Sequence, residues 1–169
     1  GFDAIAPGAS KALRFDVKNR AGLYWFHPHP HGFTAEQVHA GLAGLMVVTD
    51  AEDEALDASL GLVPGNRLAP ALADTRVASG SLRPYAPSEE DCLHGWFGNR
   101  ALANGALDAR FPVSSGWVRL QLLNASNARG LLLAFKDNGR DGTGVPFHLL
   151  GTDGGLLAAP IPLEQVFLY

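Results

Sequence analysis

The sequence contains little sulfur, with one cysteine, Cys92, and one methionine, Met46, among its 169 residues. A single cysteine excludes an internal disulfide and is too few for a thiolate-rich metal site. No apolar run approaches the roughly 20 residues that span a bilayer, and no charged segment followed by an apolar one opens the sequence. We therefore expect no membrane span, and we expect any export signal to have been removed or never present.

An excess of charge of one sign is also lacking. The formal net charge is only −4, so electrostatics gives no reason to expect binding to nucleic acid or to an anionic membrane. Glycine and proline, by contrast, are frequent, with 20 and 11 residues, which is typical of short strands joined by turns. The length allows one domain, or two small or incomplete ones.

Apolar residues recur with the period of β-strands in both halves of the chain. Residues 12–17 alternate apolar and polar, which predicts a half-buried strand that forms a hairpin with residues 23–26. Residues 45–49 predict a compact buried strand, and the more polar residues 33–39 a short helical turn. Further short strands are expected within residues 111–169. The expected fold class is therefore an all-β sandwich.

The middle of the chain is harder to interpret. Residues 51–65 are acidic and lack alternation, which predicts a linker between domains or a solvated acidic loop with one possible helical turn. The cluster Glu89, Glu90 and Asp91 predicts a solvated surface, and Asn104-Gly105 predicts a hairpin turn.

Three of the six histidines fall within five residues, in the run YWFHPHPHG at residues 24–32. In an extended strand, residues i and i+2 lie on the same face, so His27 and His29 are predicted to lie side by side, about 6.5–7 Å apart. Pro28 and Pro30 favour this extended geometry. Imidazole is the commonest metal ligand, and two metal ions about 3.5–4 Å apart could each take one ring. The alternative is an exposed His-Pro turn.

Three stretches of the sequence together resemble the multicopper oxidases, a family that includes laccases, bilirubin oxidases and bacterial copper-resistance oxidases. The first joins the histidine run to GLAGLMVVTD at residues 41–50. The second is RLQLLNASNAR at residues 119–129, and the third is FHLLGTDGGLL at residues 147–157. They occur in the order in which the family has them.

The resemblance implies cupredoxin-like Greek-key β-sandwiches. We expect residues 1–50 to be the C-terminal part of a first cupredoxin-like domain, residues 51–65 a linker, and residues 66–169 a second such domain, truncated at its C-terminus. The chain would then be an internal fragment of a longer oxidase.

The resemblance also implies a cofactor, copper, and ligands for it. The family binds three coppers in a trinuclear cluster through eight histidines, and His27 and His29 match positions that each bind one of the two type 3 coppers. His31 matches a position that is not normally a ligand, and we expect it to support the ligands or to lie at the surface. Trp25 and Phe26 are expected to pack beneath the ligand strand.

The implied function is part of a copper-dependent oxidoreductase that oxidises phenols, aromatic amines or metal ions and reduces O2 to water. The implied partners are the remaining domains of the parent oxidase, O2 and a small reducing substrate, and the implied location is periplasmic or secreted. The 169-residue chain alone lacks most of the copper ligands and is predicted to be inactive. The alternatives are a non-catalytic, cupredoxin-like structural or interaction protein of the periplasm, or an incidental single-metal site at residues 27–31.

The other candidate ligands are expected to have ordinary roles. His39 is predicted to lie at the surface, or else to donate a hydrogen bond to a metal ligand. His94 has no partner at ligand spacing, and His148, among apolar neighbours, is predicted to be buried. Cys92 is expected to be a structural or incidental thiol.

Overall fold

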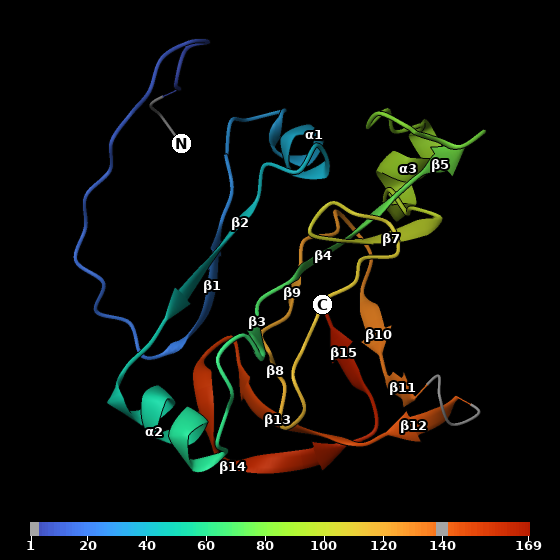
Figure 1. The fold of residues 1–169 in the computed structure, drawn as a ribbon. Helices are drawn as coiled ribbons and strands as arrows, with labels where there is room; N and C mark the ends of the chain where they lie inside the picture. The colour runs from blue at the N-terminus through green and yellow to red at the C-terminus, as the bar shows by residue number, and fades with distance from the viewer. Residues whose placement is uncertain (1–3, 138–141) are drawn as a thin grey trace.

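The computed structural model describes residues 4–137 and 142–169. Within these residues three helices are embedded in a succession of short strands (Figure 1). The helices are α1 (Thr34–His39), α2 (Ala51–Ser59) and α3 (Glu89–His94). The strands are β1 (Gly22–Phe26), β2 (Gly44–Val48), β3 (Arg67–Leu68), β4 (Ala71–Thr75), β5 (Val77–Ala78), β6 (Ser81–Leu82), β7 (Arg100–Ala103), β8 (Arg119–Leu120), β9 (Leu123–Asn124), β10 (Leu131–Leu133), β11 (Phe135–Asp137), β12 (Thr143–Val145), β13 (Phe147–Thr152), β14 (Gly155–Leu163) and β15 (Val166–Leu168).

The strands form small sheets, which confirms the expected all-β class. Most pairs are antiparallel: β1 with β2, β13 with β14, β10 with β15, β11 with β12, β5 with β6, and β4 with β7. Two pairs are parallel, β3 with β8 and β4 with β9. Figure 1 shows the β1–β2 pair on one side of the molecule and the strands from β3 onward on the other, with α2 below the β1–β2 pair.

The predicted strand at residues 12–17 is wrong. Residues 10–20 belong to no strand, and Leu13, Phe15 and Val17 are 74%, 68% and 49% exposed. Alternation alone does not make a strand, because its backbone groups must also find a ladder partner. Strand β1 takes β2 as its partner instead, with Gly22 opposite Val48 and Phe26 opposite Gly44. In Figure 1 the N-terminal segment runs apart from the rest of the chain.

The acidic segment after β2 is a regular helix and not a solvated loop. Helix α2 begins after Asp50, whose side chain accepts hydrogen bonds from the backbone N–H groups of Asp53 (2.9 Å) and Ala21 (3.0 Å). These N–H groups hold the pKa of Asp50 below its usual value. One carboxylate therefore caps the helix and also fixes the start of β1.

One close backbone approach depends on glycine, and an aromatic side chain packs on a second glycine. At Gly155 φ is +111°, and a Cβ there would lie 2.9 Å from the carbonyl oxygen of Ala21, so the β13–β14 hairpin can approach the start of β1 only without a side chain. The ring of Phe26 lies over Gly44 in the same way, 2.3 Å from where a Cβ would stand. The predicted turn at Asn104-Gly105 is also found, with both φ angles positive (49° and 76°).

Polar side chains dominate the most buried positions. Among the described residues the buried apolar ones are Ala21, Trp96 and Ala125, whereas the buried polar ones are Asp53, Asn66, Asp74, Thr75 and Arg119, of which Asp53 and Asn66 are fully buried. No helix in the described part of the chain is both long enough and apolar enough to cross a membrane.

Candidate metal centre

The histidine run continues β1 as an extended segment, and its side chains form a row of rings. We call Trp25, His27, His29 and His31 the ring column. Adjacent ring centroids are 4.4 Å apart for Trp25–His27, 5.9 Å for His27–His29 and 6.1 Å for His29–His31. The predicted side-by-side placement of His27 and His29 is therefore found. His31 lies in the same row.

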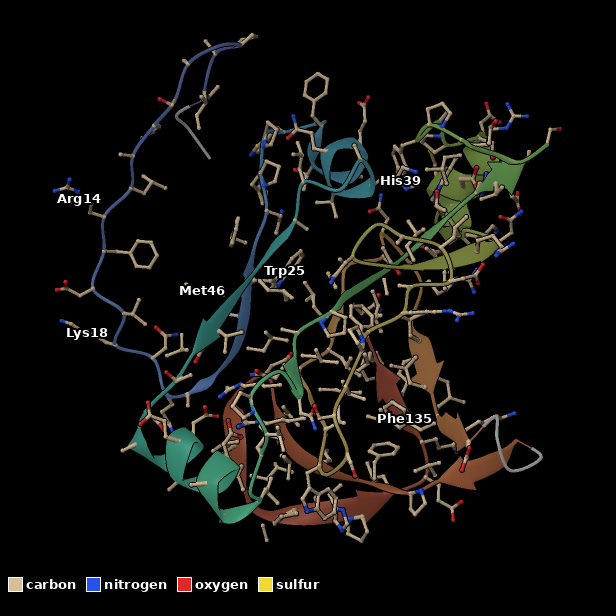
Figure 2. The ribbon with its side chains drawn as sticks, in the orientation of Figure 1. Arg14, Lys18, Trp25, His39, Met46 and Phe135 are labelled. Atoms are coloured by element: carbon tan, nitrogen blue, oxygen red, sulfur yellow. The ribbon has the colours of Figure 1, made fainter. Side chains whose placement is uncertain are left out.

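The environment of the ring column is open. Trp25 is 44% and Phe26 64% exposed, so neither is buried beneath the ligand strand, although the Trp25 ring stacks on His27. His27 is half-buried, and His29 and His31 are exposed. Figure 2 shows Trp25 on the side of the β1–β2 pair that faces β4, and Met46 on the opposite side.

The end of the run is held by the helix that follows it. The carbonyl oxygen of Pro30 accepts hydrogen bonds from the hydroxyl of Thr34 (3.0 Å) and from the backbone N–H of Phe33 (3.2 Å). Gly32 turns the chain with φ of +81°, a conformation that favours glycine. Helix α1 thus fixes where the column ends.

The imidazole nitrogens of the ring column are suitable as some of the ligands of a copper site. Imidazole nitrogens are good ligands for copper, and first-row affinities peak at Cu(II). No group of three or more His, Cys, Asp or Glu side chains within residues 4–137 and 142–169 converges to hold a metal ion. Each histidine of the column can therefore give one ligand to a different metal ion, as in a metal cluster whose other ligands come from elsewhere. The geometry does not favour one ion held by His27, His29 and His31 together.

Helix α1 is attached to the second half of the chain. The side-chain amide of Asn127 donates to the carbonyl of Ala35 (2.9 Å). His39 lies half-buried with its ring 5.5 Å from that of Tyr85 and 5.6 Å from that of Trp96, on the side of α1 that faces α3 (Figure 2). His39 is therefore partly exposed, as a surface residue is, and two rings distant in sequence cover part of it.

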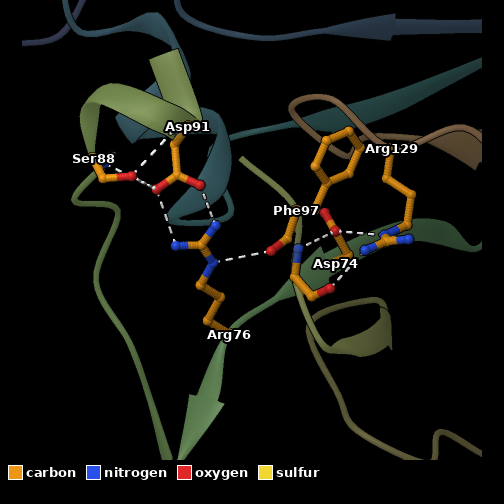
Figure 3. A network of polar contacts seen from close by, with 7 residues as sticks. Asp74, Arg76, Ser88, Asp91, Phe97 and Arg129 are labelled. Atoms are coloured by element: carbon orange, nitrogen blue, oxygen red, sulfur yellow. Dashed lines mark hydrogen bonds and ion pairs between the residues drawn. The ribbon is translucent and has the colours of Figure 1, made fainter. Parts of the chain in front are cut away.

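Arg76 packs on the Trp96 ring and belongs to a network of polar contacts around α3 (Figure 3). The guanidinium of Arg76 lies 3.8 Å from the centre of the Trp96 ring, pairs with both oxygens of Asp91, and donates to the carbonyl of Phe97. Ser88 and Asp91 form the capping box at the start of α3: the Ser88 hydroxyl accepts from the backbone N–H of Asp91, and the Asp91 carboxylate accepts from the backbone N–H of Ser88. The hydrogen bonds from Arg76 and then from Ser88 hold the pKa of Asp91 well below its usual range.

A second carboxylate in this region, Asp74, accepts hydrogen bonds from Arg129 (2.8 Å) and from the backbone N–H of Gly98 (2.5 Å).

The prediction that the acidic cluster at residues 89–91 is solvated is wrong for Asp91, whose side chain is only 10% exposed. Its ion pair with Arg76 spans 15 residues, and no local pattern indicated it.

A second polar cluster joins α2 to β3 and β8. Asp53 and Asp57 of α2 pair with Arg67 of β3 and Arg119 of β8 at distances of 2.5–2.9 Å. We call these four residues the α2 ion-pair cluster. Burial alone would lower the pKa of Arg119, but its hydrogen bonds to Asp57 and Asp53 outweigh burial and raise it. The prediction of a solvated acidic segment is therefore wrong for Asp53, which is 1% exposed.

Asn66 lies beside this cluster and is fully buried. Its amide nitrogen donates to the carbonyls of Ser114 (3.0 Å) and Trp117 (2.9 Å), and its amide oxygen accepts from the backbone N–H of Ser114 (2.8 Å). Sequence reasoning missed Asn66, because its importance lies in partners about 50 residues away.

The remaining candidates lie apart from the ring column. Cys92 is exposed on α3. His94, at the end of the same helix, lies 3.3 Å from Glu90. His148 is exposed with its ring near Trp117. The prediction of a buried His148 is wrong because its side of β13 faces outward.

Comparison with known proteins gives one consistent result. Residues 1–53 match the family model described as multicopper oxidase. The chain is 35% identical to the cell division protein FtsP of Photorhabdus laumondii, over 97% of this chain and 33% of that protein. It is 34% identical to the multicopper oxidase mco of Staphylococcus aureus, over 97% of this chain and 34% of that protein.

Solved structures agree with these relatives. The chain superposes on the McoA multicopper oxidase of Aquifex aeolicus with a TM-score of 0.78 and 30% identity, over 91% of this chain and 33% of that one. It superposes on the laccase-like multi-copper oxidase CueO of Ochrobactrum sp. with a TM-score of 0.77 and 36% identity, over 97% and 35%. The chain thus spans about a third of the length of the relatives it matches, and its fold is cupredoxin-like.

Proposed function

Because the chain belongs to the multicopper oxidase family, we propose that it supplies His27 and His29 as copper ligands of a copper-dependent oxidoreductase. The observation that carries the proposal is the ring column, in which the two imidazoles lie 5.9 Å apart on one side of an extended segment. Two metal ions about 3.5–4 Å apart could each take one of them. His31, 6.1 Å from His29, is a weaker candidate, because the resemblance does not make it a ligand.

The chain's own residues hold and orient these ligands. His27 is half-buried with its Nδ1 hydrogen-bonded to the carbonyl of Pro28, and α1 anchors the end of the run through Pro30. Bound copper would supply one-electron redox chemistry. In the complete parent, that chemistry would oxidise a phenol, an aromatic amine or a metal ion and reduce O2 to water, as the family resemblance implies.

The family also supports finer proposals about the parent protein. We expect its partners to be its remaining cupredoxin-like domains, O2 and a small reducing substrate, and its location to be periplasmic or secreted. The division into residues 1–50, 51–65 and 66–169 stays a prediction, with α2 inside the middle segment. For the 169-residue chain by itself we expect no oxidase activity, because two or three histidines cannot bind a trinuclear cluster.

A second candidate is a structural role in cell division. Relatives named cell division protein FtsP are as similar to this chain as those named multicopper oxidase, at 35% and 34% identity. Such a role does not need a metal, so the presence of His27 and His29 favours the oxidase.

Copper binding tests whether His27 and His29 act as metal ligands. The purified chain is titrated with Cu(II) by calorimetry, beside a His27→Ala/His29→Ala variant and a His94→Ala control that removes an exposed histidine outside the column. We expect the double variant to lose more than about a hundredfold in affinity, because both imidazole ligands are gone, and the control to bind like the wild type. Equal binding by all three proteins would contradict the proposal and favour the structural role.

A further inference from the structure

Trp25 is the residue whose position the proposed function leaves unexplained. It is large and aromatic, yet it is 44% exposed. Strand β1 places it two residues before His27, on the same side of the extended chain. Its ring stacks on the His27 ring, with centroids 4.4 Å apart and planes 27° apart.

The other neighbours in the ring column are arranged differently. His27 and His29 are 5.9 Å apart with planes tilted by 35°, and His29 and His31 are 6.1 Å apart and meet edge to face at 61°. Within the ring column, His27 is therefore the histidine with one face covered by a stacked ring. Stacking restricts the plane in which an imidazole can rotate.

A second contact determines which nitrogen of the same ring carries the hydrogen. Nδ1 of His27 lies 2.9 Å from the carbonyl oxygen of Pro28. A carbonyl oxygen only accepts, so Nδ1 must carry the hydrogen and donate it. In the neutral ring the free lone pair is then on Nε2, the atom available to a metal.

We infer that Trp25 is a positioning residue for His27: the stacked indole and the Pro28 carbonyl together hold the imidazole so that Nε2 is the nitrogen offered to a metal. Hydrogen-bonded partners that orient a ligand histidine typically change metal affinity by about 10–100-fold when they are removed. His27 is a ligand only under the function proposed above, so the test has to separate the two.

The first measurement needs no metal. Long-range ¹H–¹⁵N spectra of the ¹⁵N-labelled chain at a pH where His27 is neutral report which ring nitrogen carries the hydrogen. We expect the Nδ1–H form for His27. A dominant Nε2–H form would overturn the inference whatever the chain binds.

The second measurement is Cu(II) affinity in matched variants. We expect Trp25→Leu, which removes the stacked ring, to bind Cu(II) about tenfold more weakly than the wild type, at the lower end of the range for orienting partners. Trp25→Phe keeps an aromatic ring and should therefore retain most of the wild-type affinity for Cu(II). The control is Trp117→Leu, since Trp117 is comparably exposed, at 55%, and also lies beside a histidine, His148, outside the column. The control should bind like the wild type.

Tryptophan fluorescence supplies an independent signal. Copper on His27 would lie next to the Trp25 ring and quench it, so we expect most of the Cu(II)-dependent quenching to disappear in Trp25→Phe and to persist in Trp117→Phe. Circular dichroism of each variant verifies folding, and the His27 tautomer of the wild-type chain tests the inference if Trp25→Leu does not fold.

The outcomes are distinct. If His27→Ala binds Cu(II) as tightly as the wild type, the proposed copper site itself fails and the role of Trp25 fails with it. If His27→Ala loses binding while Trp25→Leu keeps wild-type affinity, the copper site stands and the positioning role is overturned.

Discussion

The ring column and the α2 ion-pair cluster are both built from polar groups, but they are used in opposite ways. In the ring column the rings are exposed or half-buried, and they contact one another along an open strand. In the α2 ion-pair cluster Asp53 and Arg119 are 1% and 7% exposed, and each pairs with residues of other elements. Ligands must stay accessible to bind, whereas a buried charge is tolerated only when it is paired.

This contrast fits the metal-binding role proposed for the ring column and a stabilising role for the α2 ion-pair cluster. Substitutions in the ion-pair cluster should lower the stability of the fold, and substitutions in the ring column should leave the fold intact but weaken metal binding.

Arg119→Ala should be the most destabilising change. It leaves the buried Asp53 and the partly buried Asp57 with one cation in place of two, and breaking a buried pair typically costs about 3–5 kcal/mol. Urea denaturation measures the loss. The control is Arg20→Ala, because Arg20 and Glu52 form a pair with both side chains about two-thirds exposed, and exposed pairs contribute at most about 1 kcal/mol. Equal effects of the two substitutions would contradict the structural role of the cluster.

Asn66→Ala should have the next largest effect. It removes three hydrogen bonds from a fully buried side chain and leaves two carbonyls and one N–H without their partner. An unsatisfied buried group costs about 1–3 kcal/mol. Asn66→Asp keeps the acceptor for Ser114 but not the two donors, so denaturation of both variants separates the donor and acceptor contributions. A wild-type midpoint for Asn66→Ala would show that water satisfies these groups.

Asp91→Asn should lower the stability of the fold by less than Asn66→Ala does, and the size of the loss should depend on pH. The folded-state pKa of Asp91 lies below its ordinary 3.8 because Arg76 and Ser88 hydrogen-bond to the carboxylate. Its contribution is therefore complete well above pH 3.8 and is lost as the pH falls from 3.8 toward the folded-state pKa. Thermal unfolding should show a lower Tm for the variant at pH 7 and a difference that shrinks below pH 3.8.

The control for this pH dependence is Asp108→Asn, because Asp108 is 86% exposed and lies 3.4 Å from Arg100. This control should track the wild type across the pH range. A constant difference in Tm between Asp91→Asn and the wild type would mean that packing, and not charge, explains the effect.

The His27→Ala/His29→Ala variant should change stability least, by about 0.5 kcal/mol or less, as is usual for substitutions away from the core. The comparison is made without metal by urea denaturation, because bound copper would itself stabilise the folded state. A loss as large as that of Asn66→Ala would show that the ring column also supports the fold.

Local patterns predicted the local elements well. The turn at Asn104-Gly105, the helical turn that becomes α1, and the strands at residues 23–26 and 45–49 each depend on neighbours in sequence, which propensity and alternation describe. The same reasoning failed for residues 12–17, which alternate correctly but have no pairing strand in the described part of the chain. A strand is a property of two segments, and the sequence of one of them cannot supply the other.

The all-β class, the resemblance to multicopper oxidases and the placement of His27 beside His29 can be predicted from the residues alone. The histidine placement follows because a two-residue spacing on an extended chain puts side chains on one face. The same spacing puts Trp25 on that face, and the structure adds the stacked geometry of its ring on His27. Folding brings the buried and paired polar groups to their partners: Asp53 to Arg119, Asp91 to Arg76, and Asn127 to the backbone of α1. Alternation sets the face of a residue within its own strand, whereas these pairs join residues that are far apart in sequence.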